Sequence, residues 1–422
     1  MRFRDVGVKV TSALLVLGGM GCGGEARSTD EGDTVDAAAV IDASPGAVDA
    51  SVPEPGPHFF VHLSDVHIDS GAFAAPAFDY VLGTVLPSFP DVPVLVTGDL
   101  VEAGNNTDSW AYYEQQTIEA GLSPDTYVEC AGNHDSLLDG DLDNYLAHSV
   151  AGRAGRGLHA QYDFTRYGQR VRVLTTNTAD AGDPVRDGAG FITSGQVDDI
   201  LAGVDDDPTE PYATIVLGHH PKDTPDGLEL LGTDEEMERL LDEADATAYL
   251  FGHSHVHFNY WDGMVLHTSA ATSGNPGDGV YTDWVDPEFS LFAIDAGPSE
   301  ISMPILGVPP EALHSPWPAV MITRPADRGF AAGLGSGDVN PWAVPLPRNT
   351  ADNLLHAGAF APGGVQAVYF AVDGGAEQPM EVVDGYYRAR FTTPDADACE
   401  ITVRAVAGGE SSSQTVTVDL AP

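Results

Sequence analysis

The chain has 422 residues, long enough for two domains, and 43% of them are hydrophobic, which supports at least one full core. Its 18 Lys and Arg against 64 Asp and Glu give a net charge of −46, which argues against a protein that grips nucleic acid through the phosphate backbone. The three cysteines, Cys22, Cys130 and Cys399, are too few for a disulfide framework. An anionic substrate would need local positive charge, which a metal centre could supply.

The N-terminal segment has the pattern of an export signal. Arg2, Arg4 and Lys9 precede a short apolar stretch, which falls below the ~20 residues that a membrane-spanning helix needs. The "GMGC" that follows resembles the end of a bacterial lipoprotein signal, and this resemblance implies a lipid on Cys22. We therefore predict a lipoprotein-type signal peptide over residues 1–22. An ordinary cleaved export signal, or no signal at all, stays open as an alternative.

Residues 23–56 have the composition of a disordered acidic linker. They are rich in Ala, Asp, Gly and Pro and contain no aromatic residue, so they cannot bury enough apolar surface to offset their ordering entropy. We expect a tether between a membrane and the folded part of the chain. We expect the protein to lie in the periplasm or on the cell surface, where the lipid anchors it to a membrane.

Five segments of the following region share one design. Each is a short, largely apolar run that ends in Asp, Asn or His, most often just after a glycine: "FFVHLSDVH" (59–67), "VPVLVTGDL" (92–100), "TYVECAGNHD" (126–135), "ATIVLGHHP" (213–221) and "ATAYLFGHSH" (246–255). Continuous apolar runs of this length are typical of strands buried on both faces. Because ligands collect beyond the carboxyl ends of strands in α/β sheets, we expect the five tips to converge on one site.

Three helices are predicted between these strands. The first spans residues 108–122, with Asp108 as a candidate N-cap and Gly121 as a stop. The second and third span residues 194–204 and 234–244, where apolar residues recur at helical spacing.

Helical patterning disappears after about residue 305. Six or seven short apolar runs separated by Pro, Gly and Asp turns follow, including a hairpin expected around Asp373. We predict an immunoglobulin-like β-sandwich over residues 306–422. We expect this domain to act as a structural spacer. Trp317 and Trp342 near its start keep open a module that binds cell-wall glycan, so the domain could contact envelope components.

Taken together, the five tips "DVH", "GDLVE", "GNHD", "GHHP" and "GHSH" resemble the calcineurin-like metallophosphoesterase superfamily, over roughly residues 58–300. The resemblance implies a fold of class α/β, a four-layer α-β-β-α sandwich over residues 57–305, with the smaller all-β sandwich after it. It also implies a metal-dependent phosphoric ester hydrolase.

Two metal ions follow from the same resemblance. Hydrolysis of a phosphate ester profits from two cations about 3.5–4 Å apart, and Asp99 occupies the position that bridges them in the family. The implied ligands of the first metal are Asp65, His67 and His255, and those of the second are Asn133, His219 and His253. Asp65 and His67 are two residues apart, as are His253 and His255, so an extended backbone would point each pair the same way.

Other residues near the motifs have roles that the resemblance suggests. His134 matches the family's catalytic histidine, which hydrogen-bonds the phosphate and can protonate the leaving group. Asp135 either orients that imidazole or is an ordinary turn acid. Glu102 is expected just outside the ligands. His220 stays open as a ligand in place of His219, although the family's His-x-Pro spacing favours His219.

Two residue types restrict the metals. Four imidazoles and no cysteine disfavour Fe–S sites and soft metals, and they equally disfavour a pure oxygen cage for Mg²⁺ or Ca²⁺. Mn, Fe, Zn or Co remain.

His257 continues the alternation after His255, and it lines the substrate pocket or lies on the surface.

The expected activity is hydrolysis of phosphodiesters, or of a broad range of phosphoesters, by attack of a metal-bound hydroxide. Glu102 stands where purple acid phosphatases carry a tyrosine ligand, and no arginine follows "GNHD" as in the protein phosphatases. The motifs are similar to those of bacterial phosphodiesterases that act on cyclic nucleotides or glycerophosphodiesters. We expect a small phosphoester as substrate and no stable nucleic-acid binding. A degenerate phosphoesterase acting as a surface binding protein is the alternative, although no expected ligand is missing.

Overall fold

The computed structural model describes residues 55–179, 190–205, 209–222, 234–263, 265–274, 287–305, 316–329 and 340–422. The chain divides into two compact units, Met1–Val52 and Pro53–Pro422, and all described residues belong to the second. The predicted signal, Cys22 and nearly all of the predicted linker lie outside the described residues. In the described ranges, no helix is long and apolar enough to cross a membrane.

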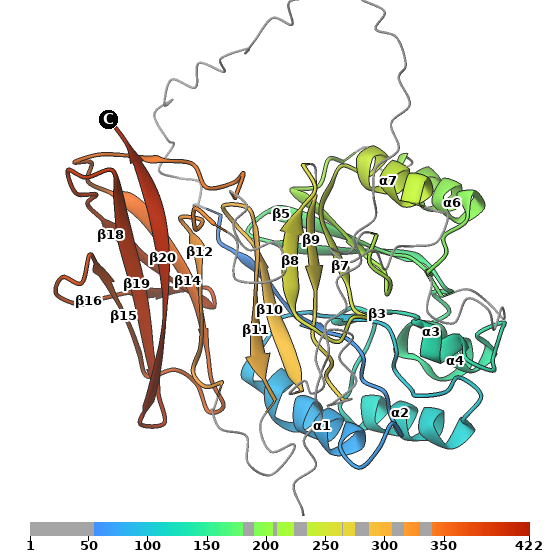
Figure 1. The fold of residues 1–422 in the computed structure, drawn as a ribbon. Helices are drawn as coiled ribbons and strands as arrows, with labels where there is room; N and C mark the ends of the chain where they lie inside the picture. The colour runs from blue at the N-terminus through green and yellow to red at the C-terminus, as the bar shows by residue number, and fades with distance from the viewer. Residues whose placement is uncertain are drawn as a thin grey trace, which may run out of the picture. The chain divides into compact units, whose positions relative to one another are not determined.

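The first sheet carries three of the five predicted strands. Its order is β11-β10-β1-β2-β3, and Figure 1 labels β11, β10 and β3 of it. Its strands are β1 (His58–Leu63), β2 (Val94–Thr97), β3 (Tyr127–Cys130), β10 (Glu288–Ile294) and β11 (Pro298–Pro304). β1, β2 and β3 run parallel, so their carboxyl ends lie at one edge, while β10 and β11 are added antiparallel.

The second sheet carries the other two predicted strands, β6 and β7. Its order is β4-β5-β6-β7-β9-β8. Its strands are β4 (Ala160–Arg166), β5 (Gln169–Thr175), β6 (Ala213–Leu217), β7 (Ala246–Phe251), β8 (Phe258–Trp261) and β9 (Leu266–Ser269). β5, β6, β7 and β9 are parallel. The five predicted strands therefore form two sheets.

The two sheets share one apolar cluster. Phe60 and Leu95 of the first sheet belong to the same buried cluster as Ile215 and Leu250 of the second. The neighbouring residue on each strand points the other way, because side chains alternate along a strand, and Val61 contributes to a different cluster with helix side chains. Both faces of these strands are buried, which explains the continuous apolar runs.

Helices supply the outer halves of these clusters. The regular ones are α1 (Ala74–Tyr80), α2 (Thr107–Glu119), α4 (Asp143–His148), α6 (Ser194–Asp205) and α7 (Asp234–Glu243), with short turns α3 (Asn133–Ser136) and α5 (Val150–Arg153). Phe78 of α1 packs in the cluster of the first sheet. Val197 of α6 and Met237 of α7 pack in that of the second. The domain is a mixed α/β fold.

The three predicted helices are confirmed, with one corrected cap. α6 and α7 begin at the predicted residues and end within one residue of prediction. The first helix begins earlier than predicted, because the cap is Asn106: its side-chain oxygen accepts the backbone N–H groups of Asp108 and Ser109. Asp108 instead lies in the first turn, where its charge complements the helix dipole.

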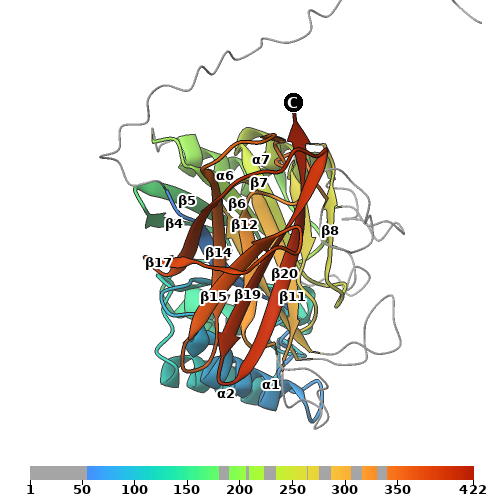
Figure 2. The ribbon, with the colours of Figure 1, turned by 90° about the vertical axis from the view of Figure 1, so that its left-hand side faces the viewer.

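The C-terminal region is all-β in its described residues. One sheet has the order β12-β14-β18-β17 and the other β13-β20-β19-β15-β16. Their strands are β12 (Ala319–Arg324), β13 (Leu346–Pro347), β14 (Asn353–Phe360), β15 (Ala367–Val372), β16 (Gln378–Pro379), β17 (Glu381–Val383), β18 (Tyr386–Phe391), β19 (Ala398–Ala407) and β20 (Glu410–Ala421). Figure 2 shows β15, β19 and β20 side by side. The expected hairpin after β15 is present, and one apolar cluster joins the two sheets.

β12 packs on both of its faces. Val320 lies in the cluster inside the C-terminal region, whereas Met321 lies in the cluster that contains Phe59 of β1. Trp317 is only 9% exposed, and its ring centroid lies 5.7 Å from that of Phe89. Because that ring is buried in this cluster, Trp317 cannot offer a flat face to a glycan.

Trp342 also contacts an aromatic ring, that of Trp261 in β8, with ring centroids 4.9 Å apart. The observations that supported a glycan-binding module therefore describe packing between the C-terminal strands and the α/β domain.

Candidate metal centre

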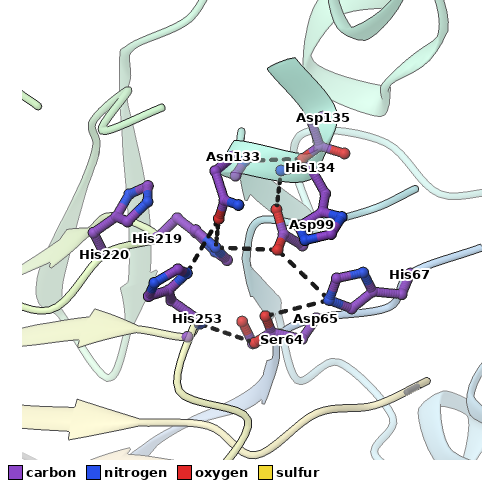
Figure 3. Close-up of polar contacts among 12 residues, drawn as sticks. Ser64, Asp65, His67, Asp99, Asn133, His134, Asp135, His219, His220 and His253 are labelled. Atoms are coloured by element: carbon purple, nitrogen blue, oxygen red, sulfur yellow. Dashed lines mark hydrogen bonds and ion pairs between the residues drawn. The ribbon is translucent and has the colours of Figure 1, made fainter. Parts of the chain in front are cut away.

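Six of the seven predicted metal ligands, all but His255, are labelled in Figure 3 and lie close together there. The seven follow the carboxyl ends of five strands. They are Asp65 and His67 after β1, Asp99 after β2, Asn133 after β3, His219 after β6, and His253 and His255 after β7. The two sheets each contribute part of the set. The site therefore exists only where the edges of the two sheets meet.

One group of ligand atoms surrounds Asp65. Its Oδ1 lies 3.2 Å from His255 Nε2 and 3.7 Å from His67 Nε2, and the two imidazole nitrogens lie 3.1 Å apart. Asp65 Oδ1 is buried without a hydrogen-bond partner. A buried carboxylate oxygen and two facing imidazole nitrogens suit a cation between them, since a cation would satisfy all three.

A second group surrounds Asn133. Its Oδ1 lies 2.9 Å from His219 Nε2 and 3.1 Å from His253 Nδ1. Asp99 contacts both groups, because its Oδ2 lies 3.2 Å from His219 Nε2 and 3.5 Å from His67 Nε2. Two nitrogens, an amide oxygen and a carboxylate oxygen form a donor set that first-row transition metals accept.

The carboxylates of this site are held ionised. Burial alone would raise the pKa of Asp99, but His219 and His134 hold it far below its usual range. Burial disfavours the charged form of histidine too, so burial alone would lower the pKa of His67 and His219. Asp65 and Glu102 instead raise the pKa of His67 to about 10, and Asp99 raises that of His219 to about 9. The site therefore attracts positive charge.

Five of the predicted ligands have a left-handed backbone. Their φ angles are 52° for Asp65, 48° for His67, 53° for Asp99, 65° for His253 and 58° for His255. The expectation that an extended backbone continues through each His or Asp pair is therefore wrong. Non-glycine residues in this region cost about 1–2 kcal/mol each, and such strain concentrates at functional sites.

Glycines let the strand tips approach one another. A Cβ on Gly132 would lie 2.2 Å from Asp99 Oδ1, and one on Gly252 would lie 1.7 Å from Ser64 Oγ and 2.6 Å from Asp65 Oδ2. The glycines that precede Asn133 and His253 are therefore required by close contacts with the loops after β1 and β2.

We expect Gly252→Ala to lower the free energy of unfolding by about 1–3 kcal/mol, because the added methyl group overpacks the contact with Ser64. Urea denaturation measures the effect. Gly195→Ala in α6 is the control: a Cβ there meets nothing within 4 Å, so this helix substitution should not destabilise the protein. A Gly252→Ala protein as stable as the wild type would contradict the packing argument.

Neighbouring groups fix the histidine tautomers. His219 Nδ1 donates to the backbone oxygen of Thr97 at 2.7 Å, which leaves Nε2 for Asn133 and Asp99. His67 Nδ1 lies 3.0 Å from Glu102 Oε2, which turns its Nε2 toward the site. Glu102 therefore contacts a ligand from outside the ligand set, where it was expected.

Asp135 does not orient His134. Its carboxylate accepts hydrogen bonds from the backbone N–H groups of Leu100 at 2.9 Å, Val101 at 3.1 Å and Gly132 at 2.8 Å. The turn α3 starts after Gly132 and leaves N–H groups unsatisfied, so its third residue folds back to accept one. Asp135 ties the loops after β2 and β3 together, which favours the ordinary turn acid over the residue that orients His134.

His134 is oriented by a backbone group instead. Its Nδ1 lies 2.8 Å from the carbonyl oxygen of Glu102, and its backbone N–H donates to Asp99 Oδ1 at 2.8 Å. The imidazole side chain is 30% exposed. A neutral His134 therefore carries its proton on Nδ1, and Nε2 is the atom left for a substrate. No sequence signal marks a carbonyl oxygen for this role.

His220 differs from His219 in its partners. Its Nδ1 lies 2.9 Å from Thr178 Oγ1, and the backbone N–H groups of both histidines donate to the same hydroxyl. His219 is the one in contact with Asn133 and Asp99. Thr178 follows β5 and was not predicted. His257 is partly buried, with its Nδ1 3.0 Å from the carbonyl oxygen of Ser269.

Comparison with known proteins assigns the α/β domain. Residues 60–257 match the family model described as calcineurin-like phosphoesterase. A search of the curated proteins gave no match.

Solved structures give only distant likenesses. GAP50, described as the anchor in the inner membrane complex of Plasmodium, is 12% identical, with 60% of this chain and 86% of that chain covered and a TM-score of 0.40. A putative 5′-nucleotidase from Staphylococcus aureus is 12% identical, with coverages of 59% and 54% and a TM-score of 0.39. A 5′-nucleotidase from Candida albicans is 14% identical, with coverages of 58% and 52% and a TM-score of 0.39. The chain thus spans about half the length of the two nucleotidases.

Proposed function

Residues 60–257 form a calcineurin-like phosphoesterase domain, and on this premise we propose that the protein hydrolyses phosphoesters with two transition-metal ions. The observation that carries the proposal is the position of Asp99. Its Oδ2 lies within 3.5 Å of His67 Nε2 and 3.2 Å of His219 Nε2, and so it contacts two ligand groups at once.

The ligand groups divide as the family resemblance implies. Asp99 would contribute to both ions. Asp65, His67 and His255 would hold the first ion, and Asn133, His219 and His253 would hold the second. This mixture of imidazole, carboxylate and amide donors suits Mn, Fe, Zn or Co. When bound, the ions lower the pKa of water and stabilise charge on the phosphoryl oxygens.

His134 is the proposed general acid. Its Nδ1–H is engaged by the Glu102 carbonyl at 2.8 Å, so a protonated imidazole presents Nε2–H to the substrate. Donation of this proton to the leaving oxygen contributes typically about 100- to 10,000-fold to such reactions. The imidazole of His134 is partly exposed, so a substrate can reach it, whereas Asp135 is buried.

The charge around the site favours a diester. In the described part of the chain, the site carboxylates Asp65, Asp99 and Glu102 pair with histidines and with no Lys or Arg. The whole chain carries −46 charges. A phosphomonoester can bring two negative charges and a diester only one, so the acidic surroundings oppose the monoester more strongly.

We further propose the layer arrangement of the α/β domain, the type of fold of the all-β region and the location of the protein in the cell. The α/β domain is a four-layer sandwich, and the all-β region is immunoglobulin-like. The N-terminal sequence supports export and a lipid on Cys22, which would tether the enzyme to the cell envelope.

Metal reconstitution tests this function. The full chain, purified in detergent and stripped of metal with a chelator, is supplied with Mn²⁺, Fe²⁺, Zn²⁺ or Co²⁺ and assayed on bis(p-nitrophenyl) phosphate and p-nitrophenyl phosphate. We expect turnover only with metal, and faster turnover of the diester. Preference for the monoester would reject the diester assignment. Two bound metals without turnover of either would point to the degenerate binding protein.

A further inference from the structure

A buried polar network lies between the sheets, below the metal centre. His62 on β1 has 0% exposure. Its Nδ1 lies 2.7 Å from Glu300 Oε1 on β11, and its Nε2 lies 3.0 Å from Thr97 Oγ1 on β2. These three residues tie three strands of the first sheet together in the interior of the domain.

His62 and Glu300 form a buried hydrogen-bonded pair. The hydroxyl of Thr97 lies 3.0 Å from His62 Nε2 and 3.3 Å from the carbonyl oxygen of Leu63, so it contacts the ring on the side opposite Glu300. Burial alone would raise the pKa of Glu300, but His62 and Thr268 lower it.

The network also reaches the second sheet. The hydroxyl of Thr268 on β9 faces two acceptors, the other carboxylate oxygen of Glu300 and Asn259 Oδ1 on β8, and its single hydrogen bonds to one of them at a time. Glu300 is 2% exposed and Thr268 is 0% exposed. The two sheets are thus joined by directional bonds as well as by apolar contact.

The same network touches the support of the metal centre. The carbonyl oxygen of Thr97 accepts His219 Nδ1 at 2.7 Å and Ser64 Oγ at 3.2 Å. His219 comes from the second sheet, whereas Thr97 precedes Asp99 by two residues in the first. One residue, Thr97, therefore connects the buried His62–Glu300 pair to predicted ligands from both sheets.

We propose that the His62–Glu300 pair is a positioning device that holds the two sheets at the offset where their ligand sets meet. The inference rests on the proposed metal centre. Apolar cores tolerate small shifts and repacking, but a satisfied hydrogen-bond network specifies one arrangement. Five ligands have φ angles near 50–65°, so their support must hold them against that backbone preference.

Cobalt binding tests the proposal without using turnover. The metal-free full chain is titrated with Co²⁺, whose visible absorption reports affinity and coordination, and urea denaturation is measured in parallel. His62→Leu removes both hydrogen bonds at similar volume. Phe292→Leu, in the apolar cluster between the same sheets, removes only apolar volume and is the matched control.

We expect both variants to lose stability, but only His62→Leu to bind Co²⁺ about 10–100-fold more weakly with an altered spectrum, as for other groups that support metal ligands. His62→Gln, which retains hydrogen-bonding groups, should recover part of the affinity and also serves if His62→Leu does not fold. A folded His62 variant with wild-type affinity and spectrum would overturn the positioning role alone. A wild-type chain that binds no Co²⁺ would instead overturn the proposed metal centre.

Discussion

Asp99→Asn is expected to abolish metal binding and turnover together. The substitution keeps the shape of the side chain and leaves an oxygen to accept the backbone N–H of His134, but it removes the charge that faces His67 and His219. A metal centre supplies several kcal/mol of transition-state stabilisation, and each 1.36 kcal/mol is tenfold in rate. We therefore expect a loss of at least about 1,000-fold, with metal content measured by mass spectrometry alongside turnover.

His134→Ala separates chemistry from metal binding. His134 hydrogen-bonds Asp99 through its backbone N–H, which alanine retains, so this variant should keep its metals and still lose about 100-fold or more in rate. An Asp99→Asn protein with two bound metals and ordinary turnover would reject the bridging assignment. Loss of metal from both variants would indicate collapse of the loop rather than loss of a ligand.

Asp295→Ala is expected to lower the free energy of unfolding by about 3–5 kcal/mol, because it breaks a buried charged network. Asp295 follows β10 and is 5% exposed. Its carboxylate contacts Arg324 Nη2 at 3.0 Å, Thr323 Oγ1 at 2.8 Å and His356 Nδ1 at 2.9 Å, all from the C-terminal region. Urea denaturation checks the prediction, and Asp397→Ala, at an exposed pair with Arg348, should change little.

The same contacts bear on the role of the C-terminal region. Trp317, Met321 and Phe360 belong to the cluster that contains Phe59 and Phe289, and exposing such a surface to water is costly. We expect the full chain to unfold in one transition and a chain ending at residue 305 not to fold. A truncated chain that folds and turns over small substrates at the full rate would show instead that the C-terminal region is a spacer.

Local patterns in the sequence predicted much of the α/β domain. The apolar runs before "DVH" and "GNHD" identified buried strands, because a strand covered on both faces needs apolar residues on both. The ligand types were visible for a similar reason, since metal chemistry restricts the side chains that can stand at the strand tips. The helix cap was predicted less accurately: the N-cap of α2 is Asn106 and not Asp108, which lies in the first turn.

Tertiary structure decided the arrangements that depend on distant segments. The sequence could not assign β6 and β7 to a second sheet, nor show that Asp135 serves backbone N–H groups while the Glu102 carbonyl orients His134. It could not show the left-handed backbone of the ligands, since that conformation is imposed by neighbouring loops.

His62 and Glu300 illustrate the difference most clearly. They are separated by 238 residues, and each alone has the pattern of an ordinary strand residue. By itself the sequence determined the chemistry at each strand tip and the burial of each segment, because composition and spacing are local properties. Only the tertiary structure decided which tips, carbonyl oxygens and buried charges meet, because those contacts depend on how the two sheets and the C-terminal strands pack together.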